Sequence, residues 1–194
     1  IGAAFGSAGE RCMATSVALP VGKIQKPFME LLMKKANSIN VGGSLDPNSE
    51  MGPLITKEHK AKVIKYIECG VTEGAKLEMD GRNISLQGFE NGNFVGPTIF
   101  NNVTRDMTIY KEEIFGPVLS VVNVDTYEEA IDHINTHEFG NGTSVYTSNG
   151  NIARNFTKNV QIGMVGINIP IPVPMAFHSF GGWKGSIFGG SGMH

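Results

Sequence analysis

The chain has 194 residues, 41% of them hydrophobic and 18% charged, which is typical of a folded domain and excludes a disordered chain. Its formal net charge of -2 gives no reason to expect a nucleic acid or an anionic membrane as a partner, and no apolar run reaches the length of a membrane span. Two cysteines, Cys12 and Cys69, allow at most one bridge, which excludes a disulfide scaffold and favours a reducing compartment.

The first third of the chain predicts a strand followed by two helices. Residues 14–21, ATSVALPV, are short and rich in β-formers and predict a buried strand. A helix follows, in which Pro27 is tolerated in the first turn. Residues 40–55 form a loop rich in Gly, Pro and Asn, and Thr56 is placed to cap a second helix. The apolar positions at helical spacing are Ile24, Phe28, Leu31, Leu32, Ala36 and Ile39 in the first helix and Val63, Ile64, Ile67 and Val71 in the second.

The rest of the chain predicts strands that alternate with helices. Thr126 and Glu129 have the spacing of a capping box, in which two side chains satisfy N–H groups at the start of a helix. Such alternation predicts crossover units and an α/β fold with a mainly parallel sheet covered on both faces. The predicted strands lie within residues 76–103 and at 117–124, 143–147 and 164–168, and the predicted helices begin after Thr126 and near Asn149.

Cys12 lies in the stretch FGSAGERCMA, residues 5–14, where a small-residue helix is expected to lead into a strand. A thiolate attacks a carbonyl carbon readily, and nearby positive charge, which Arg11 supplies, favours the thiolate. A lone cysteine is more often a buried packing residue, so the residues around Cys12 leave both interpretations open. The absence of a Cys-x-x-Cys pair disfavours a metal site or disulfide exchange at this thiol.

Two further motifs change the interpretation of Cys12. KEEIFGPV, residues 111–118, places two carboxylates and an aromatic before a Gly-Pro turn, and FHSFGGWKGS, residues 177–186, is a glycine-rich aromatic loop. Alone, each is typical of ordinary turns. The three motifs in this order resemble the aldehyde dehydrogenase superfamily over essentially the whole chain. The cysteine signature of that superfamily, Phe-x-x-x-Gly-[Gln/Glu]-x-Cys, is matched by Phe5, Gly9, Glu10 and Cys12.

Finer stretches resemble one branch of the superfamily, the CoA-acylating methylmalonate-semialdehyde dehydrogenases. They are GERCMA, ENGNFVGPTI, YKEEIFGPVL, FGNGTSVYTSNG and GINIPIPVP. The resemblance implies that residues 1–194 form the three-layer α/β catalytic domain, without the NAD-binding domain and the C-terminal strand that joins subunits. A start without Met, an end at GGSGMH and the lack of a strand-Gly-x-Gly-x-x-Gly-helix fingerprint also favour a fragment.

The resemblance implies a site built around Cys12. Cys12 would add to the aldehyde carbon to give a thiohemiacetal, and loss of hydride to NAD would leave a thioester. The N–H of Cys12 would be one oxyanion donor, while the Asn and the hydrolytic Glu of the family lie upstream of this chain. Glu113 would bind the nicotinamide ribose hydroxyls, and Phe115 would pack near the nicotinamide. Phe177 and Phe180 would line the aldehyde pocket. A solvated helix end for Glu113 and a core position for Phe115 are the alternatives.

Arg11 stands beside the nucleophile, and the resemblance implies that it binds the carboxylate of a semialdehyde through two parallel hydrogen bonds. The alternative is a structural salt bridge, for instance to Glu10. In this branch, methylmalonate or malonate semialdehyde becomes propionyl- or acetyl-CoA with loss of carbon dioxide, so coenzyme A takes the acyl group. The run PIPVP, residues 170–174, would be a rigid pocket wall.

Two rival functions stay open. One is a hydrolytic semialdehyde dehydrogenase, such as one for succinate semialdehyde, which would not predict Arg11 or IPIPVP in this form. The other is a fragment that is inactive on its own. His133 and His137 could share a helix face and a metal, but no third ligand is evident. Cys69 is expected to be a packing residue. The full-length protein is expected to be a homotetramer, in the cytoplasm if bacterial and in the mitochondrial matrix if eukaryotic.

Overall fold

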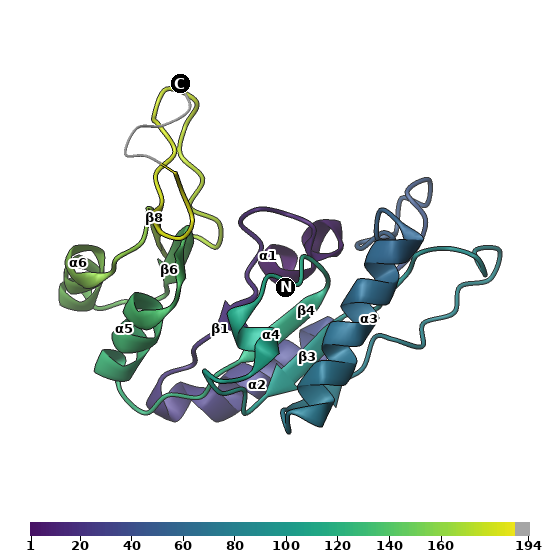
Figure 1. The fold of residues 1–194 in the computed structure, drawn as a ribbon, viewed down its shortest axis with the longest axis horizontal. Coiled ribbons are helices and arrows are strands. Elements are labelled where there is room, and N and C mark those ends of the chain that lie inside the picture. Colours follow the sequence, from purple (N-terminus) through teal and green to yellow (C-terminus); the bar gives the residue numbers. More distant parts are fainter. Residues whose placement is uncertain (189–194) are drawn as a thin grey trace. The chain divides into compact units, whose positions relative to one another are not determined.

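The computed structural model describes residues 1–188, which divide into two compact units, Ile1–Asp125 and a second that begins at Thr126 (Figure 1). The stretch GGSGMH, on which the expectation of a fragment partly rests, lies outside the described residues. The first unit holds α1 (Gly2–Phe5), β1 (Val17–Ala18), α2 (Gln25–Ala36), α3 (Lys57–Thr72), β2 (Lys76–Met79), β3 (Thr98–Asn101), α4 (Thr108–Lys111) and β4 (Val118–Val121).

The first unit is organised by a four-stranded sheet in the order β1-β4-β3-β2. The strands β1, β4 and β3 are parallel, and β2 runs antiparallel to β3. Every residue of β4 is buried, and so are the first three of β3. Because alternate residues of a strand point to opposite faces, this continuous burial means that both faces of the sheet are covered there, as predicted.

The predicted strand at 14–21 is partly wrong. Only Val17 and Ala18 are in β1, and both are half-buried. Among the described strands, β1 pairs with β4 alone and forms the edge of the sheet, so it receives cover from one neighbour only.

The two long helices of the first unit begin where the sequence predicts. Pro27 lies in the first turn of α2, and Thr56 Oγ1 accepts a hydrogen bond from the N–H of His59 at the start of α3. Val63 and Ile67 are fully buried, but Val71 is 44% exposed, so the predicted stripe is wrong at its last position. At 3.6 residues per turn, Val71 lies about 80° around the helix from Val63 and outside the buried face.

The second unit contains α5 (Tyr127–Thr136), β5 (Phe139–Gly140), β6 (Gly142–Val145), α6 (Gly150–Asn159), β7 (Met164–Ile167) and β8 (Trp183–Lys184). The predicted capping box of Thr126 and Glu129 is present, and Asn149 caps α6. The strands β6 and β7 are parallel and joined through α6, which makes the predicted crossover unit. The prediction of an α/β fold with a mainly parallel sheet is therefore confirmed.

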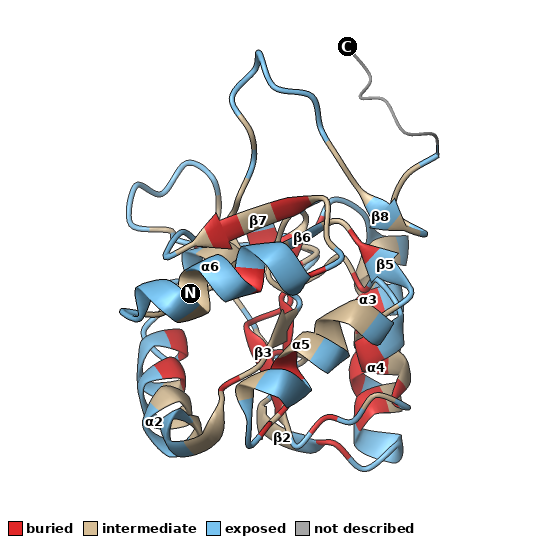
Figure 2. Ribbon diagram, turned by 90° about the vertical axis from the view of Figure 1, so that its left-hand side faces the viewer, coloured by how far each residue is buried: buried red, intermediate tan, exposed pale blue. Residues whose placement is uncertain are grey.

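The glycine-rich motif at 177–186 has a role in the fold of the second unit that the sequence did not predict. Its strand β8 pairs antiparallel with β5. Lys184 Nζ donates to the carbonyls of Ile134, at 2.9 Å, and Asn135, at 3.3 Å, in the last turn of α5, and burial lowers the pKa of Lys184. The chain between β7 and β8 is largely exposed (Figure 2), and the predicted pocket wall at 170–174 stays a prediction. Within residues 1–188, no helix is both long and apolar enough to cross a membrane.

Candidate active site

Cys12 lies in an exposed turn between α1 and β1, not in a buried position. The sequence suggested that the small residues before Cys12 are helical, but α1 ends at Phe5. Ser7, Ala8 and Gly9 follow with φ angles of 52°, 53° and 74°, all in the left-handed region. This conformation costs L-residues about 1–2 kcal/mol each, and such strain concentrates at functional sites. The backbone in front of Cys12 is therefore held in an unusual turn.

The side chain of Arg11 folds back over this same turn. Its Nε donates a hydrogen bond of 3.1 Å to Ser7 Oγ, and a Cβ added at Gly6 would lie 2.9 Å from Nη1. Within residues 1–188, Arg11 forms no ion pair, and the carboxylate of Glu10 points instead toward His59. The alternative of a salt bridge between Arg11 and Glu10 is thus absent from the structure, and Arg11, the residue next to Cys12 in sequence, is exposed.

The two carboxylates of the segment KEEIFGPV have different surroundings. Glu112 accepts a hydrogen bond of 2.6 Å from the hydroxyl of Tyr66 on α3, and this bond is the main cause that raises the pKa of Tyr66 to about 12. Glu113 is exposed, and no hydrogen bond or ion pair of its carboxylate is found in the described part of the chain. Phe115 follows at a φ of 58°, a rare conformation for an aromatic residue. We call residues 113–117 the Phe115 turn.

Residues 7–14, which we call the cysteine turn, meet the Phe115 turn. They precede β1 and β4, which are adjacent and parallel. Both turns therefore lie at the same end of the sheet, the end at which these strands begin. A Cβ added at Gly9 would overlap the carbonyl oxygen of Gly116, and one added at Gly116 would lie 2.7 Å from Val63 on α3. Both positions are confined to glycine by this close approach. The predicted proximity of the two motifs therefore has a direct backbone contact behind it.

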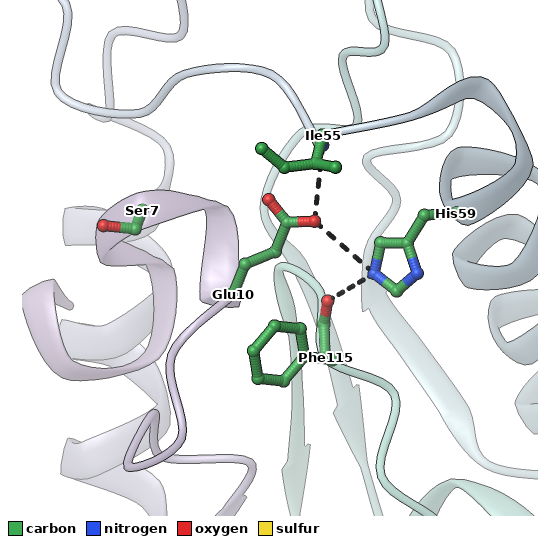
Figure 3. A pocket seen from close by; sticks show the side chains of 5 residues that line it. All are labelled: Ser7, Glu10, Ile55, His59 and Phe115. Carbon is green, nitrogen blue, oxygen red and sulfur yellow. Dashed lines mark hydrogen bonds and ion pairs between the residues drawn. The ribbon is translucent and has the colours of Figure 1, made fainter.

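An open hollow of about 530 Å³ lies where the two turns meet, within the size range of ligand sites (Figure 3). His59 Nε2 is 2.6 Å from the carbonyl oxygen of Phe115 and 3.6 Å from Glu10 Oε1. Glu10 Oε1 also accepts a hydrogen bond of 3.3 Å from the N–H of Ile55. The lining residues are Ser7, Glu10, Ile55, His59 and Phe115.

Sequence reasoning did not predict His59 or Ile55 at this site, and it treated Glu10 only as part of a signature. No local pattern marks His59, because its importance arises from contacts with residues far along the chain. Phe115 lies on the wall of the hollow, and Glu113, two residues away, is exposed. Their contacts with the nicotinamide and the ribose of a dinucleotide stay predictions.

The remaining candidates belong to other elements of the chain. Phe177 and Phe180 are in the second unit, 77% and 41% exposed, and their role in binding the aldehyde stays a prediction. His133 lies in α5, but His137 follows its end with an extended backbone, so the two do not share a helix face. Among the described residues there is no group of three or more His, Cys, Asp or Glu that could hold a metal ion. Cys69 is half-buried in α3, and among the described residues neither cysteine forms a disulfide.

Comparison with known proteins gives consistent matches over nearly the whole chain. The aldehyde dehydrogenase family model matches residues 1–194. A malonate-semialdehyde dehydrogenase of Pseudomonas aeruginosa is 51% identical over 190 residues, which are 97% of this chain and 38% of that protein. A Caenorhabditis elegans protein assigned as a mitochondrial, acylating methylmalonate-semialdehyde/malonate-semialdehyde dehydrogenase is 50% identical over 187 residues, 96% of this chain and 36% of that protein.

A crystal structure from Sinorhizobium meliloti, assigned as a methylmalonate-semialdehyde dehydrogenase in complex with NAD, matches with a TM-score of 0.96. It is 51% identical and covers 98% of this chain and 39% of that one. The chain thus spans less than two fifths of the length of the curated relatives named above.

Proposed function

The chain belongs to the aldehyde dehydrogenase family, and from this premise we propose that it is the cysteine-bearing catalytic part of an NAD-dependent malonate- or methylmalonate-semialdehyde dehydrogenase. The proposal rests chiefly on the contact between the turn of Cys12 and the turn of Phe115, which joins two motifs about a hundred residues apart at one hollow. The names of the relatives from Pseudomonas aeruginosa and Sinorhizobium meliloti support the substrate class and the cofactor.

Cys12 supplies the covalent chemistry in this proposal. Its exposed sulfur adds to the aldehyde carbon as a thiolate, the carbonyl π electrons move to oxygen, and the anion of a thiohemiacetal forms, which becomes the thioester when its carbon loses hydride. NAD, when bound, supplies the acceptor for the hydride of that carbon. The chain's part is to hold the acyl group as a Cys12 thioester until a second nucleophile takes it. The left-handed turn at Ser7–Gly9 fixes the backbone that carries the thiol.

Glu113 and Phe115 form the cofactor side of the proposed site. The carboxylate of Glu113 is free to accept hydrogen bonds from ribose hydroxyls, because Glu112 alone of the pair is engaged by Tyr66. Phe115 presents an apolar wall on which a flat ring can rest. The hydrogen bond from His59 to the Phe115 carbonyl keeps this wall in place.

Arg11 is proposed to distinguish semialdehydes from plain aldehydes. Its guanidinium is exposed, forms no ion pair among the described residues and belongs to the residue next to the nucleophile. A planar guanidinium matches the two oxygens of a carboxylate, which a three-carbon semialdehyde carries at the end opposite its aldehyde.

Coenzyme A is the proposed acyl acceptor. Its thiol attacks the Cys12 thioester after the acyl group has lost carbon dioxide and gained a proton, so malonate semialdehyde, NAD and coenzyme A give acetyl-CoA, carbon dioxide and NADH. The acylating name of the Caenorhabditis elegans relative supports this choice over release to water. We further propose that the full-length protein is a homotetramer. Its proposed location is the cytoplasm of a bacterium or the mitochondrial matrix of a eukaryote, since relatives come from bacteria and from a mitochondrion.

The test is an assay of the natural full-length polypeptide that carries these residues. With NAD and malonate semialdehyde we expect NADH formation that depends on coenzyme A, and acetyl-CoA as the product. Sustained NADH formation without coenzyme A would favour the hydrolytic alternative. The 194-residue chain assayed alone should give no steady NADH formation, because its relatives are more than twice as long and the chain holds no dinucleotide fingerprint.

Replacing Arg11 with leucine should separate two substrates. A bidentate contact between a guanidinium and a carboxylate contributes on the order of 1.5–3 kcal/mol. We therefore expect kcat/KM for malonate semialdehyde to fall by roughly ten- to a hundredfold. Propanal has no carboxylate, so its kcat/KM should change much less. The measurement is the ratio of the two losses in steady-state kinetics of the full-length polypeptide.

The matched control is Arg154→Leu. Arg154 is likewise exposed and donates to a side chain of its own local segment, Asn151, at 2.7 Å. It should leave both substrates unaffected. Equal losses for malonate semialdehyde and propanal in Arg11→Leu would show that Arg11 supports the turn through Ser7 and does not bind the substrate.

A further inference from the structure

Two segments far apart in the sequence meet at one imidazole. His59, on the first turn of α3, faces the carbonyl of Phe115 and the carboxylate of Glu10, which itself accepts the N–H of Ile55 (Figure 3). The side chains of His59 and Glu10 are only 20% and 13% exposed. The Thr56 cap fixes the backbone of His59, so the imidazole projects from a rigid element.

The contacts determine which ring nitrogen carries the proton. A carbonyl oxygen only accepts hydrogen bonds, so the 2.6 Å contact requires a proton on Nε2 of His59. Glu10 Oε1 lies 3.6 Å from the same nitrogen, beyond hydrogen-bond distance, so its attraction to this N–H is mainly electrostatic. One donor group therefore serves both the turn before β4 and the turn before β1.

The Phe115 turn needs such support. A left-handed conformation of an aromatic residue persists only where its surroundings determine it, and the φ of Phe115 is 58°. The next residue, Gly116, is confined between Gly9 of the cysteine turn and Val63 of α3. His59 and Val63 are four residues apart on α3 and thus lie on one face, which forms the support for this turn.

We propose that His59 is a positioning residue that holds the cysteine turn and the Phe115 turn in register, through Glu10 and through the Phe115 carbonyl. This inference rests on the proposed function only in its kinetic consequences. Loss of the imidazole loosens both turns together, so the wall for the cofactor and the backbone before the nucleophile lose their geometry at once.

Amide hydrogen exchange, read by mass spectrometry on the full-length polypeptide without NAD, tests the coupling directly. In His59→Leu, peptides covering residues 7–14 and 113–117 should both exchange about tenfold faster, while β3 and β4 keep their protection. His59→Gln retains an N–H donor on a side chain of similar reach and should restore both peptides to within about threefold of the wild type. Lys65→Leu, at an exposed position of the same helix, is the control and should change neither.

Kinetics give a second, independent result. His59→Leu should raise the KM for NAD about tenfold, and His59→Gln should largely rescue it. Glu10→Gln keeps an oxygen for the N–H of Ile55 but removes the charge, so it should lower kcat with the KM for NAD unchanged within about twofold.

Acceleration of exchange in the 113–117 peptide alone, in neither peptide, or throughout the sheet would overturn the proposal, because His59 would then be a local or a general packing residue. If the wild type fails to oxidise a semialdehyde, the proposed function fails, while the exchange experiment still decides the role of His59.

Discussion

Serine in place of Cys12 should lower kcat by at least about a thousandfold, the loss typical of a removed nucleophile. Serine preserves the shape of the side chain, but its hydroxyl is not ionised near neutral pH, so the first addition to the aldehyde carbon becomes very slow. The measurement is NADH formation by the full-length polypeptide at saturating NAD, coenzyme A and malonate semialdehyde.

Stability should be unaffected by this change, because Cys12 is exposed. Cys69→Ser is the matched control, since Cys69 is the other cysteine of the chain and lies in α3 away from the proposed chemistry. Its kcat should stay close to that of the wild type. A Cys12→Ser variant with a kcat within tenfold of the wild type would show that Cys12 is not the nucleophile.

Alanine in place of Gly9 should destabilise the first unit by about 2–5 kcal/mol. The added Cβ overlaps the carbonyl oxygen of Gly116, and a φ of 74° is unfavourable for alanine. Overpacking against backbone costs about 1–3 kcal/mol, and the left-handed conformation costs about 1–2 kcal/mol more. Urea unfolding followed by far-UV circular dichroism measures the change.

Gly2→Ala provides the control for this experiment. Gly2 lies on the neighbouring helix α1, and a Cβ there would meet nothing within 4 Å. Alanine is also the better helix former, so the free energy of unfolding should stay unchanged or rise by up to about 1 kcal/mol. Equal stability of Gly9→Ala and Gly2→Ala would contradict the close contact between the two turns.

The elements that the sequence predicts well are those with local signals. Thr126 with Glu129, Asn149 and Thr56 all cap helices in the structure, because capping depends on residues within one turn of each other. The strand β4 is also predicted well, since a buried parallel strand is a continuous apolar run. The shortness of β1 could not be predicted, because it follows from its place at the edge of the sheet.

The candidate site likewise contains residues that a local sequence signal predicts and residues that no such signal predicts. The motifs predict Cys12, Glu113 and Phe115 as site residues, and the structure brings the Cys12 and Phe115 turns together. The left-handed backbone before Cys12 has no clear sequence signal, because Ser7 and Ala8 are not residues that favour it. No sequence motif predicts His59 at the site, because its contacts depend on how α3 packs against two turns that are distant in the sequence.

The contact between Gly9 and Gly116 also has a consequence for the order of events during protein synthesis. Cys12 is made 104 residues before Gly116, and at about 5–20 residues per second the ribosome needs roughly 5 to 20 seconds to cover that interval. The strand β1 has no described pairing partner until β4 has been added. During that time the nascent chain carries the thiol of Cys12 without the Phe115 turn, so the geometry around the proposed nucleophile is completed only after β4 has been synthesised.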